Sequence, residues 1–158
     1  MNKEQIQNLI RELIEKTTVS VNDITITEES PTNTWFSAEV SEPHLFTLRE
    51  GEALFALNHL ARKIIETKTP PTEAENPGVS FLIDINGFQK KRVENLRAIA
   101  HMMAERARYF KSSVEVDPMP AFERRVVHEF LSGAEDLKTE STGFGPHRRV
   151  VIKYIGTI

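Results

Sequence analysis

The chain has 158 residues, no cysteine and a formal net charge of −3 at pH 7. Hydrophobic residues make up 39% and charged residues 27%, which is typical of a globular protein and not of a disordered one. The lack of cysteine excludes disulfides, zinc–thiolate sites and a cysteine nucleophile. Because no apolar run approaches the roughly 20 residues that cross a bilayer, and the N-terminus lacks an apolar signal core, we expect a cytoplasmic protein without membrane insertion.

The first 87 residues predict six elements in the order α-β-β-α-α-β. Apolar residues at helical spacing favour helices, and alternation or β-branched runs favour strands. Three prolines and a glycine predict a loop over residues 68–78. The predicted ranges are 1–16 (helix), 19–29 and 34–40 (strands), 41–51 (short helical or irregular segment), 51–67 (helix) and 79–85 (strand).

Residues 88–158 predict a second module with the order α-β-α-β-β. Its long first helix has an apolar stripe in steps of three and four, formed by Val93, Leu96, Ala100, Met103, Ala107 and Phe110. A second helix over residues 121–133 ends at Gly133, a typical helix-terminating residue. The predicted strands are 113–117, 137–142 and 148–155.

Charge is distributed unevenly between these modules. Residues 1–87 contain 7 Lys/Arg and 14 Asp/Glu, a net charge of −7, whereas residues 88–158 contain 13 and 9, a net charge of +4. This asymmetry indicates two modules with different partners. If nucleic acid is a ligand, the basic half is the better candidate, because phosphate contacts supply most non-specific affinity.

A basic pair lies on the helix predicted from residue 121. In helical projection, Arg124 and His128 lie one turn apart, just beyond the edge of the buried arc, and Glu123 falls inside the arc in the first turn. Spacing leaves three interpretations open: a basic helix edge facing solvent, an anion site made by a guanidinium and an imidazole, or a catalytic pair. The predicted buried arc consists of Phe122, Val126, Val127, Phe130 and Leu131.

The segment "ERRVVH", preceded by "VEVDPMPAF" and followed by "TESTGFGPHRRVVI", resembles the single-stranded nucleic-acid-binding domain named for an arginine and a histidine separated by three residues. More narrowly, it resembles the copy of this R-3-H (Arg-x-x-x-His) domain in the bacterial Jag (SpoIIIJ-associated) family. "LIDINGFQKKRVENLRAIAHMMAERA" is similar to that family's strand-to-helix junction. The resemblance covers nearly the whole chain and is most specific from Asp84 to Ile152.

This resemblance implies an α+β fold, with a KH-like type II module over residues 1–87 and an Arg-x-x-x-His domain over residues 88–158. It implies a non-catalytic bacterial regulator that binds single-stranded RNA or DNA, with RNA as the expected ligand. Arg124 and His128 are then the signature pair, with Arg125, Arg148 and Arg149 widening the basic surface. Another small KH protein is an implied partner. The alternative is a protein-interaction scaffold whose basic half docks on RNA non-specifically.

The KH-like half departs from its family pattern. KH domains hold the nucleic-acid backbone with a GXXG loop. In "FTLREGEAL", Gly51 matches the second glycine, whereas Leu48 replaces the first, and Glu50 places negative charge near the phosphate path. Two expectations stay open: a loop that serves as a scaffold, or weak RNA contact through Arg49 and the Gly51 amide. The family's additional N-terminal domain has no room here, so roles that depend on it are not expected.

Two consecutive arginines at the start of the last predicted strand, Arg148 and Arg149, should point to opposite faces of the sheet. One of them can then reach the exposed face, where a nucleic-acid backbone would lie; the alternative is that both are solvated charges at the end of the strand. Trp35 is expected to pack in the core. The five histidines lack metal-ligand spacing, and no Walker loop, dinucleotide fingerprint or nucleophile elbow is present. The sequence therefore predicts no enzyme, no metal site and no cofactor.

Overall fold

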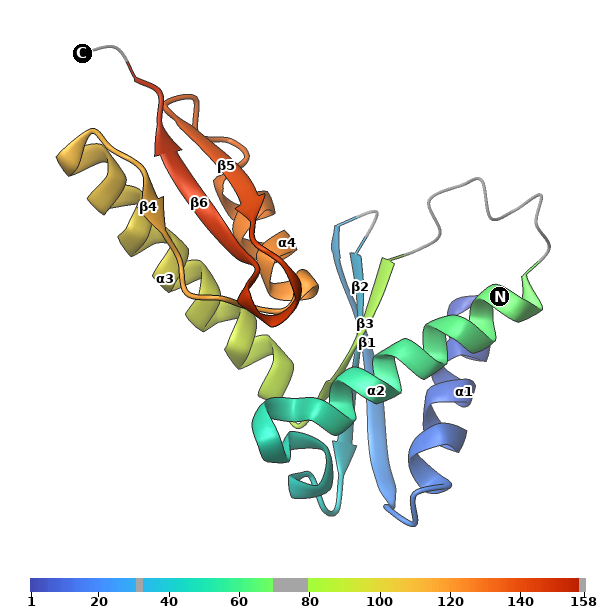
Figure 1. Cartoon of the computed structure of the whole chain (residues 1–158). Coiled ribbons are helices and arrows are strands. Elements are labelled where there is room, and N and C mark those ends of the chain that lie inside the picture. Colours follow the sequence, from blue (N-terminus) through green and yellow to red (C-terminus); the bar gives the residue numbers. More distant parts are fainter. Residues whose placement is uncertain (31–32, 70–79, 157–158) are drawn as a thin grey trace. The chain divides into compact units, whose positions relative to one another are not determined.

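The computed structural model describes residues 1–30, 33–69 and 80–156 (Figure 1). The chain divides into two compact units, residues 1–90 and residues 91–158. Within the described residues, the fold is mixed α+β with two three-stranded sheets, which confirms the predicted class. None of the helices in these ranges is long and apolar enough to cross a membrane.

The first unit contains a sheet with the strand order β1-β2-β3. β1 and β2 are antiparallel, and β2 and β3 are parallel. The predicted loop over 68–78 lies almost entirely outside the described residues. The elements of this unit are α1 (Lys3–Glu15), β1 (Val21–Ser30), β2 (Asn33–Val40), α2 (His44–Lys68) and β3 (Ser80–Ile85).

A break divides α2 into two helical parts. Leu48 has an extended backbone (φ −59°, ψ 154°), and the next three residues all have positive φ: 51° at Arg49, 58° at Glu50 and 86° at Gly51. The two parts correspond to the two consecutive helical segments predicted from the sequence. The predicted order α-β-β-α-α-β is therefore confirmed in this unit.

One core fills the space between α1, α2 and the first sheet. Phe36 and Ile83, from neighbouring strands, are fully buried there, and so are Ile10 and Ile14 of α1. Trp35 is buried as predicted, and its indole N–H donates to Oε2 of Glu29 at 3.0 Å.

The second unit has the strand order β4-β6-β5, with both pairings antiparallel. α3 and α4 pack against the same face of this sheet through a shared apolar core. The predicted order α-β-α-β-β is confirmed. The elements are α3 (Phe88–Phe110), β4 (Val114–Glu115), α4 (Ala121–Leu131), β5 (Leu137–Thr142) and β6 (Arg149–Tyr154), with a short 3₁₀ turn at Gly145–His147.

Three details of the predicted helices are wrong. Phe110 is 61% exposed and Phe130 is 43% exposed, although helical periodicity placed both on buried stripes. Each lies in the last turn of its helix. A helical projection shows which side of the helix a residue faces, but not whether another element covers that side. The C-cap of α4 is Ser132, with ordinary helical dihedrals, instead of Gly133, and its hydroxyl donates to the Glu129 carbonyl at 2.8 Å.

Candidate nucleic-acid interface

The rotation of α4 about its own axis is fixed by contacts on its buried side. Val126, Val127 and Leu131 are buried against the second core. Glu123 in the first turn is only 4% exposed, and its carboxylate pairs with the guanidinium of Arg92 on α3. Because this side is occupied, Arg124 and His128 must lie on the adjoining edge of the helix, as the sequence predicted.

Arg124 is half-buried and held against the segment that precedes α4. Its Nη1 donates to the carbonyl of Met119 at 2.8 Å. The N–H of Met119 in turn donates to the carbonyl of Arg148 at 3.2 Å. A single peptide segment therefore links Arg124 to the start of β6. Within the described ranges, the guanidinium forms no ion pair, so its remaining N–H groups are available to an anion.

His128 is half-buried beside β5. Its Nδ1 lies 2.7 Å from Oγ1 of Thr139, and the two groups form a hydrogen bond whose direction depends on the tautomer. Burial lowers the pKa of His128 below its ordinary value, and the nearby positive charge of Arg124 lowers it further. The imidazole is thus neutral at neutral pH, and it keeps one ring nitrogen for a further donor or acceptor contact.

The side chains of Arg148 and Arg149 separate to the two faces of the sheet, as alternation predicted. Ser141 and Thr139 lie opposite the core residues Val150 and Ile152, so they belong to the face that α4 covers. Nε of Arg148 donates to Oγ of Ser141 at 2.8 Å, which places this arginine at the end of the same face.

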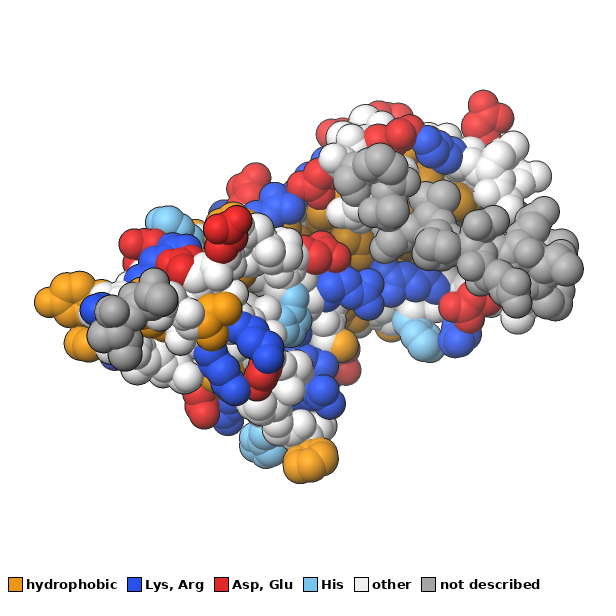
Figure 2. Space-filling view, turned by 90° about the horizontal axis from the view of Figure 1, so that it is seen from above, with side chains coloured by type: hydrophobic (Ala, Val, Ile, Leu, Met, Phe, Trp, Pro, Cys, Tyr) orange, Lys and Arg blue, Asp and Glu red, His pale blue; other side chains and the backbone are white. Residues whose placement is uncertain are grey.

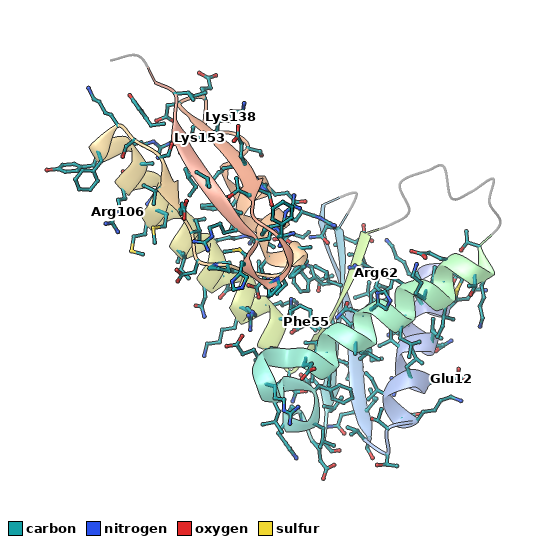
Figure 3. All side chains as sticks on the ribbon, viewed as in Figure 1. Glu12, Phe55, Arg62, Arg106, Lys138 and Lys153 are labelled. Carbon is teal, nitrogen blue, oxygen red and sulfur yellow. The ribbon has the colours of Figure 1, made fainter. Side chains whose placement is uncertain are left out.

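Arg149 belongs to the outer face, where charged side chains pair with one another. Its Nη1 lies 3.0 Å from Oε2 of Glu115. Lys153 and Lys138, on neighbouring strands (Figure 3), both approach Glu140, at 2.6 Å and 3.4 Å. These interactions lower the pKa of Glu140, mainly through the hydrogen bond from Lys153. Arg149 is therefore not brought together with Arg124 and His128.

Five side chains gather on the face of the second sheet that α4 covers, at the edge of that helix. We call this group the Arg124–His128 surface: Arg124, His128, Thr139, Ser141 and Arg148. Sequence reasoning missed both hydroxyl residues. Counting by twos from the buried Leu137 would have found them, because residues 139 and 141 then share its face. The side chain of Arg125 is exposed on α4 and forms no hydrogen bond or ion pair in the described part of the chain.

In the first unit, the loop at residues 48–51 contains two candidate binding residues, Arg49 and Gly51, which have different surroundings. The Arg49 side chain is 86% exposed and lies 3.9 Å from the Glu52 carboxylate, a weak surface pair that a ligand can replace. Gly51 is buried, and a Cβ at this position would lie 2.7 Å from Cε1 of Phe88. The conformation and close packing at Gly51 together explain the need for glycine in structural terms. Leu48 does not turn into the core, since 61% of its surface is exposed.

Comparison with known proteins identifies the second unit. The R-3-H domain matches residues 94–154. The RNA-binding protein KhpB of Bacillus subtilis (strain 168) is 28% identical over 135 residues, which cover 84% of this chain and 62% of that protein. KhpB of Lactiplantibacillus plantarum is 32% identical over 74 residues, covering 47% of this chain and 23% of that protein. KhpB of Clostridium symbiosum is 26% identical over 104 residues, covering 66% and 44%.

The chain therefore contains an R-3-H domain over residues 94–154, and it is similar to the Jag family. The resemblance seen in the sequence is confirmed, although the chain spans less than two thirds of each of these relatives. All five residues of the Arg124–His128 surface lie inside the matched R-3-H domain. Basic and acidic side chains are intermixed on the face of the molecule in Figure 2, so the geometry of this surface is more informative than overall charge.

Proposed function

We propose that this R-3-H protein binds single-stranded RNA without catalysing a reaction, and that the Arg124–His128 surface is the main contact. The observation that carries the proposal is the convergence of Arg124, His128 and Arg148, from a helix and the start of a strand, on one face of the R-3-H domain. The name RNA-binding protein KhpB, given to relatives that are 26–32% identical, supports this choice of ligand.

The two arginines and the histidine suit different parts of a nucleotide. Arg124 and Arg148 each use one N–H group within the protein and retain further donors in a planar fork, which suits phosphate. His128 is neutral because its pKa is lowered by burial and by Arg124. Its second ring nitrogen is therefore suited to hydrogen-bond a base edge or a 2′-hydroxyl, and the latter contact would distinguish RNA from DNA. Arg125 adds positive charge beside the pair.

The first unit has a secondary part in this proposal. Its element order fits a KH-like module, and its loop at residues 48–51 presents the Arg49 side chain to solvent. We assign a weak phosphate contact to Arg49 and a mainly structural role to Gly51, whose Cβ position is blocked by Phe88. The wider proposal is a bacterial cytoplasmic regulator that can also associate with another small KH protein.

The test is a titration of labelled single-stranded RNA and DNA, with duplex controls, at several salt concentrations. We expect the double variant Arg124→Ala/His128→Ala to weaken RNA binding strongly. Arg149→Ala is the matched control, because it removes a positive charge from the other face of the same sheet. Unchanged binding by the double variant would refute the site. Cleavage of the RNA that stops with His128→Ala would show instead that the protein is an enzyme.

A further inference from the structure

An aromatic side chain stands in solvent in the loop between β5 and β6. Phe144 is 91% exposed, more than any other large hydrophobic residue in the described part of the chain. Burying a phenylalanine side chain is worth about 1.5–3 kcal/mol. Because folding leaves the Phe144 ring in water, this free energy is still available to a ligand that covers the ring.

The loop holds Phe144 in a defined position. Both neighbouring glycines have positive φ, 92° at Gly143 and 54° at Gly145. The N–H of His147 donates to the Phe144 carbonyl at 3.1 Å, and the N–H of Arg148 donates to the Gly145 carbonyl at 3.2 Å. A Cβ at Gly143 would lie 2.9 Å from the His147 carbonyl oxygen, so the loop is closely packed on itself. An ordered loop of this kind reduces the entropy lost when the ring meets a ligand.

This loop adjoins the Arg124–His128 surface. Its two ends are joined by the hydrogen bond between Arg148 and Ser141, both members of that surface. At its far end, the Arg148 carbonyl accepts the N–H of Met119, whose own carbonyl holds Arg124. The exposed ring thus belongs to the same end of the sheet as the two arginines that are suited to phosphate.

We propose that Phe144 is a stacking platform for one unpaired base of the nucleic acid, whose backbone phosphates contact Arg148 and Arg124. This inference rests on the proposed function and specifies its ligand further. An exposed aromatic ring at the same end of a sheet as two arginines suits a nucleotide better than it suits an apolar peptide, because each nucleotide combines a flat base with an anion. Every base offers such a face, so the contact tolerates different sequences.

The first experiment compares Phe144→Ala with Phe110→Ala. Both phenylalanines are exposed and lie in the second unit, but Phe110 ends α3 and contacts Tyr109, which is not part of the Arg124–His128 surface. We expect Phe144→Ala to weaken binding of single-stranded RNA about tenfold, from the energy of one stacked base, and Phe110→Ala to leave it unchanged. Unchanged thermal stability of Phe144→Ala, expected for so exposed a residue, assigns the loss to binding.

A second experiment identifies the group that the ring contacts. Phe144→Trp should keep the affinity, and fluorescence of the new indole should be quenched on RNA binding, while the native Trp35 is buried and supplies a constant background. Oligonucleotides with single abasic sites should include one position at which wild type loses about tenfold and Phe144→Ala loses nothing more.

Three results would overturn the inference. Wild-type affinity in Phe144→Ala, with Arg124→Ala/His128→Ala still defective, removes the stacking contact and leaves the proposed function intact. A loss in Phe144→Ala that is the same with abasic and intact RNA at every position shows that the ring does not stack on a base. Failure of wild type to bind single-stranded nucleic acid removes both proposals.

Discussion

Arg148 donates a hydrogen bond from Nε to Oγ of Ser141, 2.8 Å away, across the two strands that frame the loop of Phe144. Arg149, one residue later, pairs with Glu115 on the opposite face. Two adjacent arginines with the same charge therefore serve different surfaces. Only the first is in a position to act together with Arg124.

We expect Arg148→Ala to weaken binding of single-stranded RNA several-fold and Arg149→Ala to have little effect. If Arg148 contacts a phosphate, its removal should also make the slope of log affinity against log salt shallower by about 0.7, the release expected from one contact on a single strand. Fluorescence anisotropy at four salt concentrations measures both quantities. An equal loss in the two variants would mean that charge alone, and not the face of the sheet, determines binding.

His128 should make stability depend on pH. Its pKa in the folded protein is below the ordinary value of 6.5, because burial and then Arg124 disfavour the imidazolium. Above that ordinary value both states are neutral and the stabilisation is complete. As the pH falls through it, the unfolded chain takes up the proton first, so the free energy of unfolding decreases until the folded-state pKa is reached.

His128→Gln can keep a hydrogen bond with Thr139 but cannot titrate. We expect the difference in unfolding free energy between wild type and this variant to shrink or reverse from pH 7.5 to about pH 5, as measured by urea unfolding followed by circular dichroism. A difference that stays constant over this range would show that His128 has the same pKa in both states.

Gly51→Ala should destabilise the first unit more than Gly87→Ala. Both glycines have positive φ, 86° and 79°, so alanine at either position costs about 1 kcal/mol of conformational strain. Only at Gly51 does the added Cβ meet a neighbour, Phe88 at 2.7 Å, which adds about 1–2 kcal/mol of overpacking. Thermal unfolding of the two variants measures the difference. Phe88→Leu in the Gly51→Ala background should recover part of the loss, and no recovery would exclude the steric explanation.

Glu123→Gln should loosen the attachment of α4. The carboxylate is buried and pairs with Arg92, whose side chain is 24% exposed, so its loss leaves a partly solvated cation without its partner on α4. We expect a loss of about 2 kcal/mol of unfolding free energy, below that of a fully buried pair. Glu129→Gln, at an exposed position of the same helix, should change stability by less than about 0.5 kcal/mol. Similar values for both variants would contradict a structural role for the Arg92–Glu123 pair.

Local periodicity predicted much of the fold and part of the site. It identified the helices and strands of both units, and it placed Val126, Val127 and Leu131 in the core and Arg124 with His128 on one helix edge. Each of these features depends on neighbours within a few residues along the chain. The resemblance to the R-3-H motif then led to the proposal that the pair binds nucleic acid, because spacing alone was compatible with a solvated basic edge.

Contacts between distant residues explain what the sequence did not predict. Thr139 joins His128 only because β5 pairs with β6 in a particular register beneath α4. Helical projection placed Glu123 inside the buried arc, but it did not identify the counter-charge, Arg92, which is 31 residues away. Phe110 and Phe130 are exposed although Ala107 and Leu131, in the same last turns, are buried, so the partner elements cover only one side of each turn.

The backbone conformation at Leu48 affects which amino acids evolution can place at this position of the loop. Its φ of −59° and ψ of 154° are accessible to every amino acid, unlike the left-handed conformation of Gly51 three residues later. Compared with a glycine at residue 48, leucine therefore does not strain the folded chain, and it reduces the freedom of the unfolded chain, which stabilises the protein by about 0.4–1 kcal/mol. A mutation at residue 48 can therefore change how closely a ligand approaches the loop without changing the fold.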